Sequence, residues 1–352
     1  MAHLAIIPGD GIGREVIDEG IRVLKHLDGI HSLGLTFEEL DYGAERYLRD
    51  GITITEDEMQ ALGNDYDAVF LGALGDPRVP SNVHAKDILL GARFQLDLYV
   101  NYRPCKLLDS RYTPLKDCNP EDISFVVFRE NTEGLYTGVG GQFKRGTADE
   151  IAIEAELNTR KGVERIIRAA FEHADKHNLK NMCMSDKSNA MRHGHDLWQR
   201  VYKEVAAEYP LIESSHLYVD VLTMEMVRAP NQFDVIVTNN LFGDIVTDLG
   251  AQLQGGIGLA ASGNLHPGKC GLFEPVHGSA PTIAGQGIAN PMAAVLTAGM
   301  MVGWLGNPEV EIQVEKAVAA CLHTNTVSAE LGGSHSTSEV GDAILRELDK
   351  LN

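Results

Sequence analysis

Short apolar runs alternate with longer amphipathic stretches along most of the chain. The short runs predict strands at residues 4–7, 68–71, 124–128, 181–185 and 235–237. Apolar residues that recur at helical spacing predict helices at 14–27, 159–177 and 195–209. A segment rich in Gly, Lys, Arg and Thr at 140–149 predicts a turn or an exposed arm between strands. This alternation predicts an α/β protein whose sheets are covered by helices.

Length and charge narrow the possible functions. A chain of 352 residues is long enough for two domains. Its net charge of −20 argues against nucleic acid and anionic membrane surfaces as partners, although a few arginines can still dominate a cleft for an anionic substrate. The start of the chain lacks a signal peptide, and the apolar stretch at 292–305 is too short for a membrane span, so it predicts a buried helix. Five scattered cysteines without a C-x-x-C pair indicate the reducing cytoplasm rather than disulfides or a zinc site.

The most informative feature is a pair of aspartates four residues apart, Asp244 and Asp248. They follow a predicted buried strand and fall on a predicted helix, where positions four apart share one face. Two such carboxylates repel each other unless a cation lies between them, and hard oxygen ligands suit Mg²⁺ or Mn²⁺. The alternative, a solvated acidic helix face, is the commoner origin of this spacing.

Five further charged residues lie close to the ends of predicted elements. Arg103 and Arg129 end predicted strands, and Arg93 lies on the helix-like stretch 86–96. Guanidinium groups bind carboxylates in a bidentate manner, so the three could hold a dicarboxylate; singly, each could equally form a surface ion pair. Lys187 follows the strand at 182–185, and a lysine beside a divalent cation can act as a general base. Asp220 follows a predicted strand at 217–219 and could supply a third metal oxygen.

Two glycine-containing segments are candidate ligand-binding loops. The turn at residues 8–15 lies between a strand and a helix, but it contains neither the G-x-G-x-x-G fingerprint nor a phosphate loop. The segment 271–291 predicts a long loop with polar side chains, and loops of that length in compact domains are usually binding loops.

These motifs, in this order, resemble the isocitrate/isopropylmalate dehydrogenase family of β-decarboxylating dehydrogenases. The resemblance extends from Pro8 to Gly333. It implies a two-domain α/β fold that is not a Rossmann fold, with mixed sheets flanked by helices. Residues 1–98 plus 253–352 would form a dinucleotide-binding domain, and the inserted residues 99–252 a substrate, metal and dimerisation domain. It also implies a homodimer with shared active sites.

The resemblance also implies a role for each candidate residue. Arg93, Arg103 and Arg129 would bind the malate carboxylates. Asp244 and Asp248 would bind Mg²⁺ or Mn²⁺ with Asp220 of the partner subunit. Lys187, also from the partner, would take the hydroxyl proton, and Tyr136 would protonate the enolate left by CO₂. The dinucleotide contacts would be Ile12, Asn189, Glu274, His277, Gly278, Ser279, Ala280, Ile283 and Asn290.

The segment before Arg93 is expected to select the substrate. Leu89 and Leu90 match the apolar pair of 3-isopropylmalate dehydrogenases, which favours 3-isopropylmalate as the substrate. Tartrate/D-malate dehydrogenases share that pair, and Lys86 stands where the isopropylmalate enzymes usually have Glu. Lys86 or His84 could instead bind the distal carboxylate of homoisocitrate. Isocitrate is disfavoured, because Asp87 and Leu89 occupy the positions of the Ser and Asn that meet its extra carboxylate.

NAD is expected rather than NADP. NADP-dependent relatives have Lys-Tyr after the H-G-[ST]-A-P motif, whereas this chain has Thr282 and Ile283. Thr282 also replaces the Asp usual in NAD enzymes, which leaves the strictness of the choice open. The rival class is a non-catalytic regulatory subunit, which is expected to lack some catalytic residues, yet Lys187, Tyr136 and both helical aspartates are present.

Overall fold

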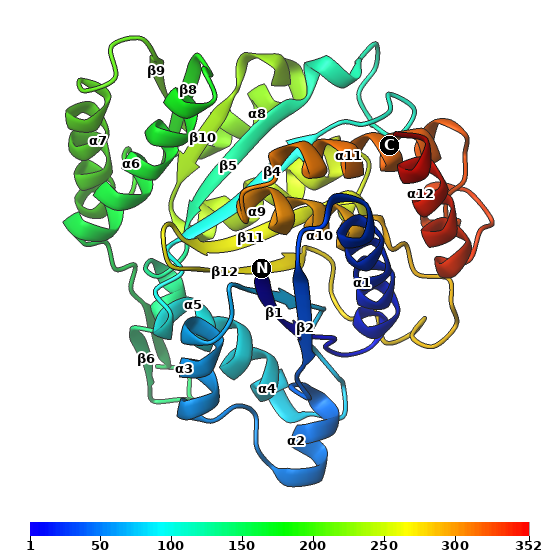
Figure 1. Cartoon of the computed structure of the whole chain (residues 1–352). Helices are drawn as coiled ribbons and strands as arrows, with labels where there is room; N and C mark the ends of the chain where they lie inside the picture. Colours follow the sequence, from blue (N-terminus) through cyan, green and yellow to red (C-terminus); the bar gives the residue numbers. More distant parts are fainter. Residues whose placement is uncertain (352) are drawn as a thin grey trace. The chain divides into compact units, whose positions relative to one another are not determined.

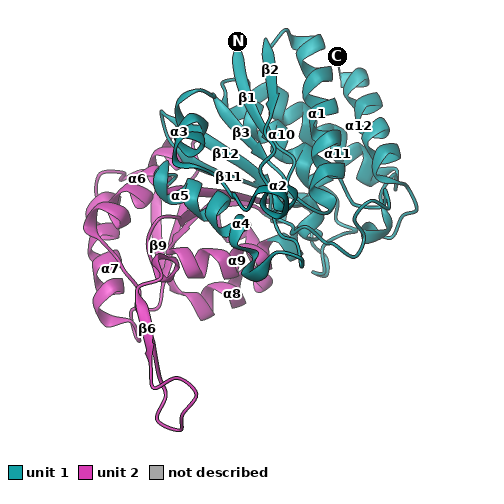
Figure 2. Ribbon diagram, turned by 90° about the horizontal axis from the view of Figure 1, so that it is seen from below, with its two compact units in different colours: residues 1–98, 106–123, 251–352 teal, residues 99–105, 124–250 magenta. Residues whose placement is uncertain are grey.

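The computed structural model describes residues 1–351 (Figure 1). Contacts divide the chain into two units, shown in Figure 2. Unit 1 comprises residues 1–98, 106–123 and 251–352, and unit 2 comprises residues 99–105 and 124–250. The first boundary falls between residues 98 and 99, as in the predicted division, whereas the segment 106–123 groups with unit 1. Lys106 explains this grouping, because its N–H donates to Gln254 Oε1 at 2.8 Å and its ammonium pairs with Glu315.

Unit 1 contains a mixed set of strands in the order β2-β1-β3-β12-β11. β1 (Ala2–Ile7) runs parallel to β2 (Leu35–Glu39) and to β3 (Ala68–Leu71). β12 (Cys270–Pro275) is parallel to β3 and antiparallel to β11 (Ala261–His266). The last four residues of β1 are all buried, which is typical of a strand covered on both faces.

Helices cover both faces of these strands. α10 (Met292–Trp304) packs against β3, β11 and β12 and is apolar on all sides, which confirms the predicted buried helix. α1 (Ile12–His31) packs between α10 and α12 (Thr337–Leu351), and α11 (Pro308–His323) also contacts both (Figure 1). Residues of α3 (Glu56–Asn64) and α5 (Gly91–Gln95) join a second apolar cluster on the other face. The remaining helices of this unit are short: α2 (Ala44–Asp50), α4 (Val83–Ala85) and a π-helix at Lys86–Leu90.

Unit 2 contains the strand order β4-β5-β10-β8-β9. β5 (Ser124–Glu130), β10 (Val235–Thr238), β8 (Asn181–Asp186) and β9 (Glu213–Tyr218) are parallel, so their carboxyl ends share one edge. The helices of this unit are α6 (Arg160–Lys176), α7 (Arg192–Ala206), α8 (Val219–Arg228) and α9 (Asn240–Leu253). The strands predicted at 124–128, 181–185 and 235–237 and the helices predicted at 159–177 and 195–209 are therefore confirmed.

Two local predictions change in the structure. Arg103 does not end a strand, because β4 (Val100–Lys106) continues through Pro104. The predicted exposed arm at 140–149 begins with β6 (Gly140–Phe143). This strand pairs with β7 (Ile151–Glu154) in an antiparallel hairpin that projects from unit 2 (Figure 2).

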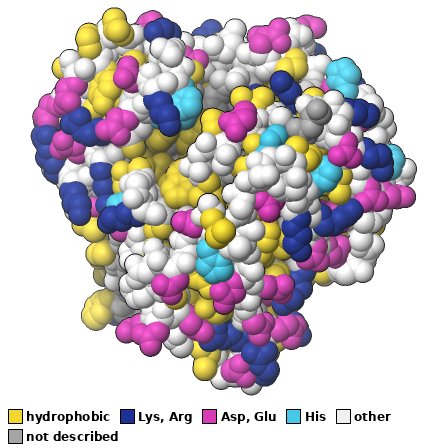
Figure 3. Space-filling view, viewed as in Figure 1, with side chains coloured by type: hydrophobic (Ala, Val, Ile, Leu, Met, Phe, Trp, Pro, Cys, Tyr) yellow, Lys and Arg dark blue, Asp and Glu magenta, His cyan; other side chains and the backbone are white. Residues whose placement is uncertain are grey.

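Two surface properties bear on possible partners. Acidic and basic side chains are interspersed over the face seen in Figure 3, so the net charge of −20 does not form a single acidic surface there. Among residues 1–351, every helix is too short or too polar to cross a membrane.

Candidate active site

Arg129 lies at the centre of the candidate site in unit 2. It occupies the end of β5, its side chain is 1% exposed, and it pairs with Asp244. Its Nε and Nη2 both donate to Asn240 Oδ1, at 2.9 and 2.7 Å. Gly243 allows this approach, because a Cβ there would lie 2.4 Å from Arg129 Cγ. The buried cation is therefore fixed by two side chains from the first two turns of α9.

Tyr136 joins the same cluster from the turn after β5. Its hydroxyl donates to Asp244 Oδ2 at 2.9 Å, and the Arg129 guanidinium lies over its ring, 5.3 Å from the centroid. The carboxylate of Glu130 shapes this turn by accepting from Thr132 N at 2.8 Å. The phenol proton thus points at a carboxylate beside a cation, an arrangement suited to proton donation once a substrate is bound.

Asp244 and Asp248 lie one turn apart on α9, as their spacing predicts. Burial raises the pKa of Asp244, but the charge of Arg129 and the hydrogen bond from Tyr136 outweigh it, so that pKa lies below its usual value. Burial raises the pKa of Asp248, and the charge of Asp244 raises it further. The side chain of Asp248 makes no hydrogen bond or salt bridge with any residue in 1–351, although the charges of Arg103 and Arg129 attract it. A cation between the two carboxylates would relieve this repulsion, so the donor set fits Mg²⁺ or Mn²⁺.

Two ligands do not complete a metal site. Within residues 1–351, no group of three His, Cys, Asp or Glu side chains is arranged to hold an ion. Arg103, the second predicted arginine of unit 2, is 8% exposed and donates through Nη1 to Thr247 Oγ1 at 2.9 Å, on the same helix as the aspartates.

Lys187 and Asp220 form a separate pair in unit 2. Lys187 follows β8, Asp220 lies in the first turn of α8, and Lys187 Nζ lies 2.6 Å from Asp220 Oδ1. The hydrogen bond from Lys187 lowers the pKa of Asp220, which is exposed to solvent. Asn189, predicted to lie near the nicotinamide, is also exposed. The structure thus brings the two residues expected to serve a partner subunit into one exposed pair.

Arg93, the third predicted arginine, belongs to unit 1. Its side chain is 7% exposed, and its Nη2 donates to Glu274 Oε1 at 3.2 Å. Asn264 Nδ2 donates to the same oxygen at 2.8 Å. Glu274 lies in β12, so the loop predicted at 271–291 begins only after this strand.

The predicted substrate-selecting segment, residues 83–92, contains the π-helix Lys86–Leu90. Leu89 and Leu90 are half-buried, and Leu89 packs against the apolar cluster under α3. Lys86 is exposed. His84 is fully buried, and its Nε2 lies 2.7 Å from Asp10 Oδ2. The interpretation of His84 as a ligand for a distal carboxylate is therefore wrong, because its ring is enclosed in the fold of the apoprotein.

The two predicted binding loops of unit 1 contact each other. Ile12 N donates to Ser279 O at 2.8 Å, and a Cβ on Gly11 would lie 2.0 Å from that oxygen. Glu15 accepts from Gly285 N and from Gly287 N, the latter at 3.0 Å. Ala280 has a φ of +38°, and Gly278 faces open space. Ile283 is half-buried in this loop.

Two buried polar atoms of this loop test whether a dinucleotide fits. His277 Nε2 and Asn290 Nδ2 are buried and have no hydrogen-bond partner within the described part of the chain. Burial lowers the pKa of His277, which favours the neutral ring. Such unpaired groups are costly unless a ligand satisfies them, so these residues fit a polar ligand such as a dinucleotide.

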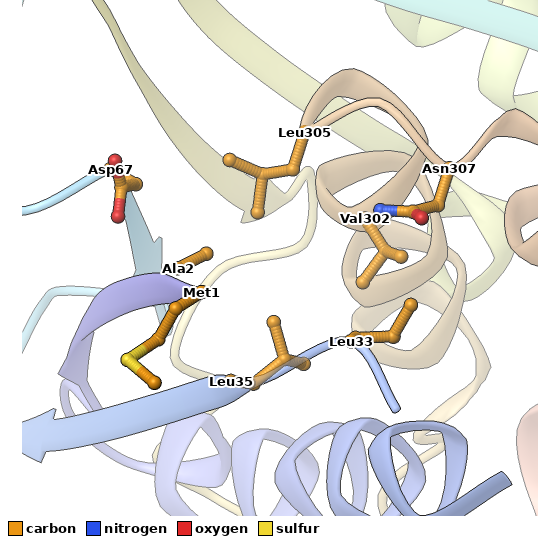
Figure 4. A pocket seen from close by; sticks show the side chains of 8 residues that line it. All are labelled: Met1, Ala2, Leu33, Leu35, Asp67, Val302, Leu305 and Asn307. Atoms are coloured by element: carbon orange, nitrogen blue, oxygen red, sulfur yellow. The ribbon is translucent and has the colours of Figure 1, made fainter. Parts of the chain in front are cut away.

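A pocket of about 350 Å³ elsewhere in unit 1 is not the active site (Figure 4). Its lining includes Ala2 and Leu35, at the amino ends of β1 and β2, with Leu305 after α10. The turn at 8–13 follows the carboxyl end of β1, and ligands of parallel α/β sheets bind at that edge.

Sequence reasoning missed Asn240 as a functional residue. Besides accepting twice from Arg129, it donates through Nδ2 to Glu133 O at 2.9 Å and so fixes the turn that carries Tyr136. Its neighbour Asn239 caps α9, because Asn239 Oδ1 accepts from Phe242 N at 2.8 Å. The signal was the Asn-Asn pair directly after a predicted strand, a position typical of helix caps.

Comparisons with known proteins agree on one family. The family described as "Isocitrate/isopropylmalate dehydrogenase" matches residues 3–344. The chain is 46% identical over 347 residues to a "3-isopropylmalate dehydrogenase" of Thermobifida fusca, covering 98% of this chain and 97% of that one. It is 47% identical over 345 residues to a protein of the same name from Streptomyces griseus, covering 97% and 96% of the two chains.

Solved structures show the same fold. The isocitrate dehydrogenase of Methylococcus capsulatus superposes with a TM-score of 0.88 at 33% identity, covering 99% of both chains. A β-decarboxylating dehydrogenase of Thermococcus kodakarensis, in its apo form, gives a TM-score of 0.82 at 35% identity, covering 100% of this chain and 97% of that one. The predicted fold class, mixed α/β sheets flanked by helices, is thereby confirmed.

Proposed function

Because the chain belongs to the isocitrate/isopropylmalate dehydrogenase family, we propose that it oxidatively decarboxylates a 3-substituted malate with NAD and a divalent cation. The observation that carries the proposal is the cluster of Arg129, Tyr136 and Asp244, with Asp248 one turn further along α9. It combines an anion-binding cation, a proton donor and a pair of metal-binding carboxylates in one unit. We take 3-isopropylmalate as the leading substrate, since the relatives described above bear that name.

Each step of the reaction has a residue to perform it. The arginines 93, 103 and 129 bind the two carboxylates of the malate. Lys187 takes the hydroxyl proton while the neighbouring carbon loses its hydride. The dinucleotide that the loop with His277 and Asn290 would hold would supply the hydride acceptor, and the cation that Asp244 and Asp248 would hold would stabilise the negative charge that develops on the substrate oxygen. The bond to the β-carboxylate then breaks, CO₂ leaves, and Tyr136 donates a proton to the carbon that keeps the electron pair.

The proposal includes a homodimer in which each subunit completes the site of the other. Asp244 and Asp248 need further ligands, which Asp220 of the partner subunit would supply, with the partner's Lys187 as the base. Large apolar side chains exposed on unit 2 support such an assembly, because isolated monomers rarely leave them in water. They are Met224 and Val227 on α8, Ile245 on α9, and Phe143 and Ile153 on the arm, each 47–67% exposed.

Unit 1 supplies the proposed dinucleotide site. The supporting observation is the pair of unsatisfied buried atoms, His277 Nε2 and Asn290 Nδ2, in a loop attached to the turn at 8–13. Thr282 is exposed and uncharged, so nothing at that position would attract a 2′-phosphate, and we propose NAD over NADP. A cytoplasmic location is part of the proposal, because all five cysteines are free thiols.

The test is NADH formation by the purified protein with Mg²⁺, with 3-isopropylmalate, isocitrate, homoisocitrate, D-malate and tartrate offered in parallel. We expect a kcat/KM for 3-isopropylmalate at least about tenfold above the others, since one buried methylene alone can contribute about that factor. A clear preference for homoisocitrate would assign the exposed Lys86 to the substrate's distal carboxylate. Absence of turnover with every acid, in a protein that still binds NAD, would support the non-catalytic subunit instead.

A further inference from the structure

A buried histidine supports the main chain of the proposed base. Lys187 N donates to His195 Nδ1 at 2.7 Å, and His195, on α7, is 0% exposed. Because Nδ1 accepts this bond, the ring proton must reside on Nε2. Nε2 in turn lies 3.2 Å from Glu156 Oε2. The ring is therefore held in one tautomer between an amide and a carboxylate.

The carboxylate of Glu156 extends this support to two further segments. Asn239 Nδ2 donates to Glu156 Oε1 at 2.6 Å, and Asn239 caps the helix that carries Asp244. The residue after Glu156 pairs with the turn before Tyr136, since Gly134 N donates to the carbonyl at position 157 at 2.8 Å. The segment around Glu156 thus contacts the segments that carry the base, the metal ligands and the acid.

Packing keeps this connection in register. Gly194, the residue before the histidine, has no room for a side chain, because a Cβ there would lie 2.5 Å from Asn158 Nδ2. Trp198 Nε1 donates to Asn158 Oδ1 at 2.8 Å, which ties the same segment to α7. Burial raises the pKa of Glu156, but the interactions with His195, Asn158 and Asn239 together outweigh it and hold the pKa below its usual value. The carboxylate therefore remains charged at neutral pH.

We propose that His195 and Glu156 are positioning residues that fix the backbone of Lys187, the base that each subunit contributes to the site of its partner. The proposal rests on the assignment of Lys187 as the base. Neither side chain needs to touch the substrate; they act by limiting where the lysine ammonium can reach, as residues behind a catalytic group do. Their loss should lower the rate of the proton-transfer step more than the affinity for the hydroxy acid.

Three substitutions of His195 separate its two bonds. Asparagine places an amide at the position of Nδ1 and can still accept from Lys187 N, whereas glutamine places it at the position of Nε2. We expect His195→Ala to lower kcat by about 10–100-fold and to change KM for the acid by no more than about twofold. His195→Asn should restore most of the lost kcat, and His195→Gln should not. The matched control is Tyr202→Phe, because Tyr202 lies on the same helix, α7, as His195. This substitution removes a buried hydrogen bond of 3.0 Å from the Tyr202 hydroxyl to Met182 O in β8 and should leave kcat unchanged.

Two measurements decide the proposal without turnover. In the wild-type protein, ¹⁵N NMR of the His195 ring should show a proton on Nε2 and none on Nδ1. Amide exchange in residues 186–191 should be faster in His195→Gln than in His195→Asn. A proton on Nδ1, or His195→Ala with the kcat of the Tyr202→Phe control, would overturn the positioning role. Failure of the proposed function is distinct, because it would appear as an inactive wild type in which the tautomer and exchange results still hold.

Discussion

The two aspartates of α9 should respond to loss of charge with opposite signs when no metal is present. Asp244 is paired with Arg129 and accepts from Tyr136, so Asp244→Asn removes a favourable interaction. The Asp248 side chain forms no hydrogen bond or salt bridge among residues 1–351, and burial and the charge of Asp244 outweigh its attraction to Arg103 and Arg129, so Asp248→Asn removes a net unfavourable interaction. In EDTA, we therefore expect the order of stability to be Asp248→Asn, wild type, Asp244→Asn.

The expected magnitudes follow from the exposure of the two side chains. Breaking a fully buried ion pair costs about 3–5 kcal/mol, but the side chain of Asp244 is 38% exposed, so we expect about 1–2 kcal/mol after solvent screening. Like charges four apart on a helix cost about 0.2–0.5 kcal/mol, which is the gain expected for Asp248→Asn. An unfolding entropy of about 2.1 cal/mol/K per residue over 352 residues converts 1 kcal/mol into about 1.4 °C. Tm should thus fall by about 1–3 °C in Asp244→Asn and rise by less than about 1 °C in Asp248→Asn.

Adding metal should move the wild type to the top of this order. At a free Mg²⁺ concentration of about 100 times its Kd, the ion stabilises the wild type by about 2.7 kcal/mol, or about 4 °C, whereas both variants should gain little. The assay is differential scanning calorimetry with EDTA and with Mg²⁺. Asp196→Asn, which removes an exposed helical carboxylate paired with Arg200, is the control and should keep the full shift. A Mg²⁺ shift that survives in both site variants would refute the assignment of these aspartates as metal ligands.

Three further predictions test other parts of the proposal. Lys187→Met should lower kcat by about 10²–10⁴-fold without changing Tm or NAD binding; near-normal NADH formation would refute the assigned base. Met224→Asp and Ile245→Asp should convert a dimer into monomers by light scattering and abolish turnover, and an unchanged dimer would show that the exposed faces of α8 and α9 are not the interface. Burial raises the pKa of Glu311 to about 7, so the folded state binds its proton more tightly than the unfolded chain does, and stability falls as pH rises from about 4.5 to about 7. Glu311→Gln should remove up to about 3 kcal/mol of that loss. The measurement is the denaturation midpoint of both proteins at pH 5 and at pH 8. The same change of midpoint with pH in both proteins would show that burial of Glu311 is not the cause.

The parts of the fold that sequence reasoning predicted are those governed by local periodicity. α10 is apolar on every side, and its length alone separated it from a membrane span. The spacing of Asp244 and Asp248 is likewise a local property, since any helix places residues four apart on one face. Arg103 was placed at the end of a strand because Pro104 follows it, yet β4 continues to Lys106. A proline is tolerated in a strand at a position where no N–H is needed for a hydrogen bond to the neighbouring strand.

The supports of the site could not be predicted, because they join segments far apart in the sequence. Asn240 bonds Arg129 across 111 positions, and Asn239 bonds Glu156 across 83. Neither pair has a spacing that a helix or strand period would produce, so only the tertiary fold reveals it. Glu274 was assigned to a loop because Gly and Pro flank its short apolar run, but pairing with β11 makes that run a strand.

The histidines show why chemistry assigned from sequence needs a measure of burial. His84 lies near the start of the substrate-selecting segment, which suggested contact with a substrate carboxylate. Its ring is instead fully buried against Asp10, whose other oxygen accepts from Ala44 N at 2.8 Å, so the pair anchors the π-helix to the turn at 8–13. Because the ring is fully enclosed and its Nε2 is held by Asp10, a bound acid could contact it only if the surrounding segment moved. In this segment Lys86 and Asp87 are exposed and Leu89 and Leu90 are half-buried, so we expect these side chains, rather than His84, to select among the substituted malates.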